Sequence, residues 1–341
     1  MLNTVHNTII DNIIINNYSH CISRIDTEDI NVLVNEISKE LSNISRDQIL
    51  NRLNVIRRYR QVFLNLKKLP FIKQRTPEWL DLRKDRLTAS DLYDAIKGGS
   101  TTITLAKKKA NVIKDKVNYN NIPALKWGTM FEPMATRCYS QANNNIQVHD
   151  FGLICDKYNK HFGASPDGIN DLGIMIEIKC PYSRQIIDGY IPPKYQMQIQ
   201  GQLAVCELHE CDYIECDFKA FDNTEEYLAD IFQESKTNHG IIAEYLMQTG
   251  EYYYLYSEPM LTPQEAIINI KKQIEEETSY SVSRIIPWKL NNINVQRVEF
   301  NFKEWQDILP KITQFWNQVE AFKLNPPLQE EKKIMFIDDD E

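Results

Sequence analysis

The sequence predicts an α/β protein in which a mixed central sheet is flanked by helices. Two features of the chain lead to this fold class. Apolar residues recur at helical spacing through residues 1–70 and again beyond residue 260, which indicates mainly helical additions at both ends. Between these regions the pattern changes to helix, three antiparallel strands, helix and strand, which is typical of an α/β sandwich with a mixed sheet.

Composition limits the class of protein. The 341 residues are 43% hydrophobic and 25% charged, as in ordinary globular proteins. No apolar run is long enough to span a bilayer, and the N-terminus lacks the features of a signal peptide, so we expect an intracellular, soluble protein without a membrane partner. The net charge of −8 argues against non-specific coating of nucleic acid, although a narrow DNA channel needs only a local basic surface.

The N-terminal helical region is predicted at 1–70. Within it, residues 29–41 and 47–66 carry apolar side chains at helical spacing. The basic cluster at 57–60 lies on the second of these helices, where a solvated helix face is a simpler interpretation than a contact with DNA. A catalytic core is expected to follow at 71–260.

The predicted core begins with helical segments. Pro77 fits the first turn of a short helix. Thr88 and Asp91 have the spacing of a capping box, so a second helix should begin there. A longer helix is predicted from about residue 127 to 142, and Pro133 marks either its start or a kink.

Strands and helices then alternate to the end of the chain. We expect strands at 146–155, 162–164, 173–180, 211–218 and 251–256. We expect helices at 194–207, 225–249, 263–277 and 302–322. The last two helices form a C-terminal extension at 261–327, and the acidic run at 328–341 is interpreted as a solvated, disordered tail.

The strongest chemical signal is the turn at 165–168 together with the apolar run that follows it. Asp167 lies in the turn, and Glu177 and Lys179 lie two positions apart, so they share one face of the predicted strand. Two charges among apolar neighbours are costly to bury unless they are paired or bind a metal. Asp167, Glu177 and the backbone carbonyl of Ile178 offer an oxygen-only ligand set, which selects Mg²⁺ or Mn²⁺ over zinc. A lysine beside such a site predicts metal-dependent phosphodiester hydrolysis.

The roles of three further side chains stay open at this point. Lys179 either orients or deprotonates the attacking water, or it stabilises charge that builds on the phosphate. Glu132 is a candidate ligand for a second metal or a bridging water, and its alternative is an exposed glutamate near a helix start. Asp156 is a candidate ligand at the end of a strand, and its alternative is a plain turn residue.

A second group of residues predicts an anion site. Arg83, Arg86, Thr88 and Ser90 surround an expected helix N-terminus, where hydroxyls, backbone N–H groups and a guanidinium suit a phosphate. The alternatives are simple capping for Thr88 and Ser90 and a surface salt bridge for Arg83. On the helix at 194–207, Gln198 and Gln200 are candidates for contacts in the site, or else for helix packing.

These motifs stand in the order found in one nuclease family. The matching segments are 75–83, 87–90, 127–132, 164–168, 176–181 and 195–200. The chain therefore resembles the YqaJ-like viral recombinases, which are nucleases similar to phage lambda exonuclease within the PD-(D/E)XK superfamily. The resemblance covers about residues 74 to 220. More loosely, the segment around Trp288 resembles relatives encoded by large DNA viruses, which implies the host cytoplasm or a viral replication site.

The resemblance implies a fold, an activity and a site. The fold is a PD-(D/E)XK, restriction-endonuclease-like core. The activity is a Mg²⁺-dependent exonuclease on double-stranded DNA ends, with two ions and with Mn²⁺ as a substitute, that degrades 5′ to 3′ for recombination, repair or replication. Asp167 and Glu177 match metal ligands, Lys179 the catalytic lysine, Gln198 an active-site glutamine, and Glu132 the helix glutamate of the active site.

The resemblance also assigns residues outside the metal site. Asp156 matches an acidic residue that ends the strand before the turn. Arg83 matches the arginine that receives the 5′-phosphate, with Thr88, Ser90 and Ser165 nearby. The implied partners are double-stranded DNA ends and a single-strand annealing recombinase. A homo-oligomer stays open, because a closed ring needs an interface that the extra residues at either end could block.

Three rival functions stay open. A structure-specific DNA endonuclease of the same superfamily is the first, but a receptor for a terminal phosphate such as Arg83 would be idle in it. An RNA-degrading shut-off nuclease is the second. The third is a non-enzymatic binding module, and the intact set of Glu132, Asp167, Glu177 and Lys179 counts against it.

Overall fold

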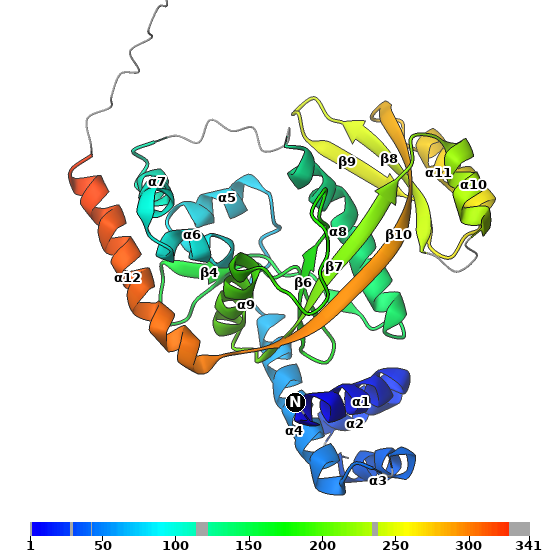
Figure 1. Cartoon of the computed structure of the whole chain (residues 1–341), viewed down its shortest axis with the longest axis horizontal. Helices are drawn as coiled ribbons and strands as arrows, with labels where there is room; N and C mark the ends of the chain where they lie inside the picture. Colours follow the sequence, from blue (N-terminus) through cyan, green and yellow to red (C-terminus); the bar gives the residue numbers. More distant parts are fainter. Residues whose placement is uncertain (1, 28–29, 42, 114–121, 234–237, 327–341) are drawn as a thin grey trace, which may run out of the picture.

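A computed structural model describes residues 2–27, 30–41, 43–113, 122–233 and 238–326 of the protein (Figure 1). The predicted fold class is confirmed, because a curved mixed sheet runs through the molecule with helices on both faces (Figure 1). The acidic tail predicted at 328–341 lies outside the described residues. No described helix is both long and apolar enough to cross a membrane.

The helices form an N-terminal group, α1 to α4, and a larger set that packs around the sheets. They are α1 (Leu2–Asn16), α2 (Tyr18–Thr27), α3 (Ile30–Glu40), α4 (Arg46–Leu66), α5 (Pro77–Lys84), α6 (Leu92–Ile96), α7 (Gly99–Lys109), α8 (Pro123–Ala142), α9 (Pro193–Cys206), α10 (Thr224–Gln233), α11 (Pro263–Glu276) and α12 (Phe302–Leu324). A short 3₁₀ turn at Ala89–Asp91 precedes α6, so the helix expected from the capping-box spacing does begin close to Thr88.

The strands form two sheets. They are β1 (Leu87–Thr88), β2 (Val148–His149), β3 (Ile154–Cys155), β4 (Phe162–Ala164), β5 (Gly168–Asn170), β6 (Met175–Lys179), β7 (Glu210–Ala220), β8 (His239–Leu246), β9 (Tyr252–Tyr256) and β10 (Val282–Glu299). The larger sheet has the order β2-β5-β6-β7-β10-β8-β9, and the smaller one has the order β1-β4-β3. In the larger sheet β6 and β7 are parallel, and the remaining neighbours are antiparallel.

Two expectations beyond residue 225 are wrong. The predicted helix at 225–249 ends at Gln233, and its second half is strand β8. A fully buried strand reads as a continuous apolar run, and periodicity does not separate such a run from a helix. The sequence analysis also placed no strand at Val282–Glu299, where β10 lies between β7 and β8. Pro287 inside this segment argues against a central strand locally, and pairing on both sides overrides that preference.

The single strand expected at 146–155 is also wrong. The segment contains β2 and β3, which belong to different sheets. Between them, a Cβ atom on Gly152 would lie 2.3 Å from the carbonyl oxygen of Ile72, so only glycine fits where the chain passes from one sheet to the other. The division into 1–70, 71–260 and 261–327 stays a prediction, although β10 places part of the expected extension inside the sheet.

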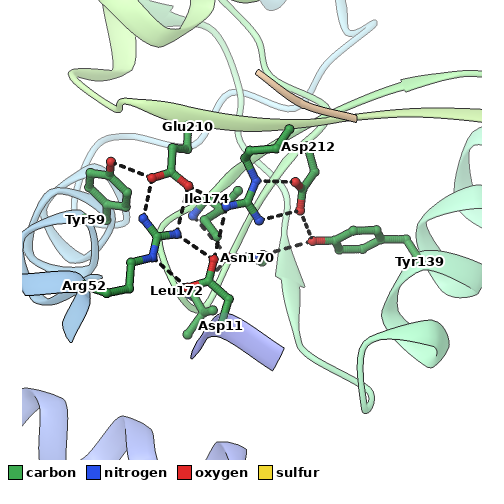
Figure 2. Close-up of polar contacts among 10 residues, drawn as sticks. Asp11, Arg52, Tyr59, Tyr139, Asn170, Leu172, Ile174, Glu210 and Asp212 are labelled. Atoms are coloured by element: carbon green, nitrogen blue, oxygen red, sulfur yellow. Dashed lines mark hydrogen bonds and ion pairs between the residues drawn. The ribbon is translucent and has the colours of Figure 1, made fainter. Parts of the chain in front are cut away.

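A buried network of charges ties the N-terminal helices to the sheet (Figure 2). Arg52 of α4 pairs with Asp11 of α1 at 2.6 Å and with Glu210 of β7 at 2.5 Å. Arg297 of β10 also contacts Glu210 at 2.5 Å, and it contacts Asp212 at 2.6 Å. Because a buried charge is costly without its partner, this network holds the helical region in one position against the core.

In the basic cluster at 57–60, Arg58 is exposed, as expected for a solvated helix face, but Arg57 and Arg60 have partners within the protein. Arg57 donates to the carbonyl of Ile25 at 2.9 Å, and the buried Arg60 pairs with Asp26 at 2.6 Å. Both guanidinium groups therefore contact α2, and neither a solvated face nor a DNA contact describes them.

The two faces of the sheet are covered by different hydrophobic clusters, and this decides where the polar side chains of β6 point. Ile176 and Ile178 pack in the cluster that contains residues of α8, whereas Met175 packs with α9. Because side chains alternate along a strand, Glu177 and Lys179 share the side of Met175 and point toward α9.

Candidate active site

The carboxylate of Glu177 is the centre of the site. Its side chain is fully buried on β6. Its Oε1 accepts a hydrogen bond from Gln198 Nε2 at 2.6 Å and one from the ammonium of Lys179. Its Oε2 accepts one from Gln202 Nε2 at 2.7 Å. Two glutamines four residues apart on one face of α9 thus orient a carboxylate that the strand buries.

Gln202 was missed by the sequence analysis, which considered Gln198 and Gln200. The structure separates these glutamines. Gln200 is buried against the start of α12, where it bonds to Glu299 and Asn301, so helix packing is its role. The spacing of four residues between Gln198 and Gln202 was the available signal for a shared face.

Lys179 is an ammonium held between carboxylates and a ring. It pairs with Glu177, and its Nζ lies 4.9 Å from the centroid of the Tyr195 ring. Burial by itself lowers the pKa of Lys179, but the carboxylates of Glu177 and Asp167 outweigh burial and hold that pKa above its usual value. These contacts place Lys179 beside the predicted metal ligands, where both of its roles, stabilisation of phosphate charge and work on the attacking water, stay predictions.

Asp167 is aimed at β6 from the turn before β5. Its Oδ2 accepts a hydrogen bond from the backbone N–H of Ile178 at 2.7 Å. Burial, and then the nearby carboxylates of Glu177 and Glu132, raise the pKa of Asp167 well above its usual value, and Lys179 only partly opposes them. The negative charge of these carboxylates is only partly neutralised by Lys179. A divalent cation bound between them would neutralise the remainder.

The donor set fits a hard cation. Asp167 and Glu177 supply carboxylate oxygens, and the adjoining carbonyl of Ile178 is the backbone candidate, so Mg²⁺ or Mn²⁺ suits the site better than zinc. Within the described ranges, no group of three or more His, Cys, Asp and Glu side chains could hold a metal by itself. The remaining positions of such an ion would fall to backbone, water and substrate oxygens, as is usual for Mg²⁺.

Glu132 of α8 is near enough to Asp167 to act on it electrostatically, and it is paired with an arginine. Its Oε2 lies 3.0 Å from Nη2 of Arg75, and both side chains are partly exposed. Arg75 has a φ of 67°, in the left-handed region that is uncommon for residues other than glycine. The sequence analysis did not select Arg75 as a site residue, because neither this backbone conformation nor the pairing across 57 positions has a local signal.

Arg83, Thr88 and Ser90 come together as predicted. Nη2 of Arg83 donates to Thr88 Oγ1 at 3.2 Å and to Ser90 Oγ at 3.4 Å. The alternative of a surface salt bridge from Arg83 to Asp81 or Asp85 is not seen among the described residues, and Asp81 pairs instead with Lys84 at 2.8 Å. Burial lowers the pKa of Arg83, although Asp91 opposes this shift. A half-buried guanidinium with two hydroxyls beside it is suited to an anion.

Two more basic residues border the anion site. Lys109 of α7 donates to the carbonyls of Arg83 and Arg86 at 3.0 Å and 2.8 Å, and it lies 3.7 Å from Asp91. The guanidinium of Arg86 donates to the carbonyl of Leu82 at 2.8 Å. Its Nε is buried and has no hydrogen-bond partner among the described residues. Lys109 is not among the site residues predicted from the sequence.

Trp79 joins the anion site to the carboxylate site. The guanidinium carbon of Arg83 lies 4.1 Å from the centroid of the Trp79 ring. The Nε1 of the same ring donates to Ser165 Oγ at 3.1 Å, two residues before Asp167. One ring therefore sets the position of the guanidinium and of the turn that carries a carboxylate. Sequence reasoning missed this role, because Trp79 reads as an ordinary apolar helix residue.

Asp156 has a local role in the structure. Its Oδ1 accepts hydrogen bonds from the backbone N–H groups of Tyr158 and Asn159 at 2.8 Å and 2.5 Å. These contacts stabilise the turn between β3 and β4. Its assignment as a metal ligand stays a prediction that no contact of the described residues supports.

Comparisons with known proteins agree with the order of the motifs. The family model of the YqaJ-like viral recombinase domain matches residues 78–209. A protein of Acanthamoeba polyphaga mimivirus is 26% identical over 348 residues, and the match covers 89% of this chain. The chain spans 60% of the length of that curated relative.

Two solved structures are similar in outline. An alkaline exonuclease, LHK-Exo, from Laribacter hongkongensis has a TM-score of 0.46 at 20% identity, over 73% of this chain and 95% of its own. A phage-related exonuclease from Haemophilus somnus has a TM-score of 0.35 at 10% identity, over 70% of this chain and 93% of its own. The part of the chain that is similar to the YqaJ-like viral recombinase domain, residues 78–209, contains most of the motif segments.

Proposed function

We propose that this protein is a Mg²⁺-dependent exonuclease that degrades double-stranded DNA from its ends, 5′ to 3′, and prefers a 5′-phosphate. The observation that carries the proposal is the link from Arg83 through Trp79 to Ser165. The anion receptor at Arg83 and the carboxylate site at Asp167 are therefore both positioned by the ring of Trp79. A terminal phosphate in the receptor would place the neighbouring phosphodiester bond at a constant distance from the carboxylates.

The remaining side chains have roles that suit hydrolysis. Asp167 and Glu177 would hold the cation, which supplies charge neutralisation and an activated water when it is bound. Lys179 is an ammonium and would stabilise charge on the phosphate that is attacked. Gln198 and Gln202 keep the Glu177 carboxylate in one orientation. Glu132 would contribute to a second ion once its partner Arg75 moves away.

The decisive experiment is a time course with purified protein and end-labelled linear DNA in Mg²⁺. Substrates with and without a 5′-phosphate are compared with a closed circular duplex of the same sequence. We expect steady loss of linear DNA, faster with the phosphate, an intact circle, and no reaction in EDTA.

Each contrary result of this time course identifies a rival. Cutting of the circle would show an endonuclease and overturn the proposal. Faster degradation of a matched RNA would point to an RNA-degrading enzyme. Binding of DNA without cleavage in either Mg²⁺ or Mn²⁺ would show that the protein is a non-enzymatic DNA-binding module. The DNA product also identifies the polarity, because 5′-to-3′ degradation leaves a 3′ single strand on which an annealing recombinase could act.

A further inference from the structure

Three tyrosines follow one another along one side of strand β9. Tyr252, Tyr254 and Tyr256 lie two positions apart, so their side chains point to the same face of the sheet. The ring centroids are 6.3 Å apart for each neighbouring pair. All three rings are partly exposed, Tyr254 and Tyr256 also pack against the hydrophobic cluster that includes residues of α8, and β9 is an edge strand of the larger sheet. We call these three residues the tyrosine row.

The tyrosine row continues directly from the candidate active site. The hydroxyl of Tyr256 donates to the carbonyl of Met130 at 2.9 Å in α8, the helix that carries Glu132. Burial, Tyr254 and the Glu132 carboxylate together raise the pKa of Tyr256 above its usual value, which places Glu132 within electrostatic range of the row. Figure 1 shows β9 beside the N-terminal half of α8.

Two cations lie against the row, and each has a carboxylate partner. Nζ of Lys126 lies 3.6 Å from the centroid of the Tyr252 ring and 2.9 Å from Oε1 of Glu244. Arg75 pairs with Glu132 and acts electrostatically on both Tyr254 and Tyr256. The surface along the tyrosine row is therefore mainly aromatic, and its positive charge is limited to two side chains that are each paired with a carboxylate. Such a surface suits a ligand that presents flat rings along a phosphate chain.

We propose that the tyrosine row binds single-stranded DNA by stacking of its bases, and that it receives the strand left behind when the other strand of a duplex is degraded. The second part rests on the proposed function. Every base has a π-face, so stacking on aromatic rings tolerates any sequence. The ring spacing of 6.3 Å exceeds the roughly 3.4 Å rise per base of a duplex strand, so the row fits an unstacked strand and not a duplex.

The same strand contains a matched control. Tyr253 lies between two members of the row and is 37% exposed, but it points to the opposite face of the sheet. Its ring lies 5.7 Å from Tyr245 and 6.3 Å from Tyr280. Substitution of Tyr253 removes a ring of the same size from the same strand without changing the row.

The test measures binding of a short fluorescein-labelled oligothymidine to the full chain by anisotropy in EDTA, where no cleavage interferes. Stacking is worth about 1–3 kcal/mol per base, which is about 5- to 150-fold in affinity. We therefore expect Tyr252→Ala to weaken binding at least about 5-fold. Tyr252→Phe, which keeps the ring, and Tyr253→Ala should bind as the unaltered protein does. A blunt duplex should bind equally to all four proteins.

Several results would overturn the inference. Unchanged oligothymidine binding by Tyr252→Ala would do so, provided that its thermal unfolding midpoint matches that of the unaltered chain. An equal loss in Tyr253→Ala would show a general effect on the strand. Tighter binding of oligouridine than of oligothymidine would reassign the row to RNA. A change only in oligomeric state, seen by light scattering, would make it a protein interface. The binding assay contains no metal and does not depend on cleavage. If the tyrosine row binds the single strand but the protein shows no nuclease activity in Mg²⁺, the proposed function is wrong, while the inference that the row binds single-stranded DNA stands.

Discussion

The guanidinium of Arg83 lies over the ring of Trp79, with 4.1 Å between the guanidinium carbon and the ring centroid. The same ring donates its N–H to Ser165 at 3.1 Å. Through this residue, α5 controls both an anion receptor and the turn that carries Asp167. The two contacts use different parts of the indole, so substitutions can separate them.

Trp79→Phe should keep the stacking on Arg83 and lose the hydrogen bond to Ser165. A hydrogen bond contributes about 0.5–1.5 kcal/mol, so we expect kcat on 5′-phosphorylated DNA to fall about 2- to 10-fold, with the preference for the phosphate retained. Trp79→Leu should lose both the rate and the preference. Single-turnover degradation of the two end types measures these effects. Loss of the preference in Trp79→Phe would contradict separate roles for ring and N–H.

Arg83→Ala should abolish discrimination between phosphorylated and unphosphorylated 5′ ends. Loss of a charge-assisted bond to a phosphate costs about 1.5–3 kcal/mol, so kcat/KM for the phosphorylated end should fall about 10- to 100-fold. The rate on the unphosphorylated end should change little. Arg83→Lys is the control, because it keeps the charge but loses the planar fork. A preference that survives Arg83→Ala would remove this residue from phosphate recognition.

Asp167→Asn should weaken Mg²⁺ binding by more than about 10-fold, because a carboxylate ligand becomes a neutral amide. Titration calorimetry with Mg²⁺ measures this effect without turnover, and cleavage should be lost in parallel. DNA binding in EDTA should persist, since the anion receptor is unchanged. Equal Mg²⁺ affinity in the variant and the unaltered protein would exclude Asp167 from the ligand set.

Lys179→Ala should lower kcat by about 10²- to 10³-fold while Mg²⁺ still binds. The ammonium is held by Glu177 and lies beside Tyr195, so its removal takes away positive charge and leaves the backbone of β6 in place. Pre-steady-state kinetics with a saturating linear duplex provides kcat. A change limited to KM would assign Lys179 to binding and not to the chemical step.

Glu210 should make stability depend on pH in the acid range. Burial would raise the pKa of Glu210, but Arg52 and Arg297 outweigh burial and lower it to about 2. This pKa is below its unfolded value of about 4.3, so ionised Glu210 stabilises the folded chain above that pH. The stabilisation is lost as the pH falls from about 4.3 toward 2.

The variant Glu210→Gln tests this expectation. Removing one partner of a buried ion pair costs about 3–5 kcal/mol, so the free energy of unfolding in urea should fall by about that amount at neutral pH. The difference from the unaltered chain should narrow as the pH falls from about 4.3 toward 2. Glu207→Gln, at an exposed ion pair nearby, serves as control and should change stability by less than about 1 kcal/mol. A pH-independent difference would contradict the ionic role of Glu210.

Much of the site could be predicted from the sequence, because its chemistry is carried by short segments. The period of two along β6 is enough to place Glu177 and Lys179 on one face. Oxygen ligands in a turn and in the next strand predict a hard cation, and the order of the motifs predicts the similarity to the YqaJ-like domain that is found at residues 78–209. Two helices of the first 70 residues, α3 and α4, also follow from local periodicity.

Only the tertiary structure decided how these pieces are oriented and supported. Gln202, Trp79 and Arg75 contact the site across 25, 86 and 57 positions, and no local pattern encodes such pairings. β10 became a central strand because β7 and β8 satisfy its backbone on both sides, despite Pro287. Sequence by itself determined which residue types could perform the chemistry. The tertiary structure decided which of these residues come into contact. Buried backbone groups need hydrogen-bond partners and buried charges need opposite charges, and where these partners are distant in the sequence, local preference does not determine the structure.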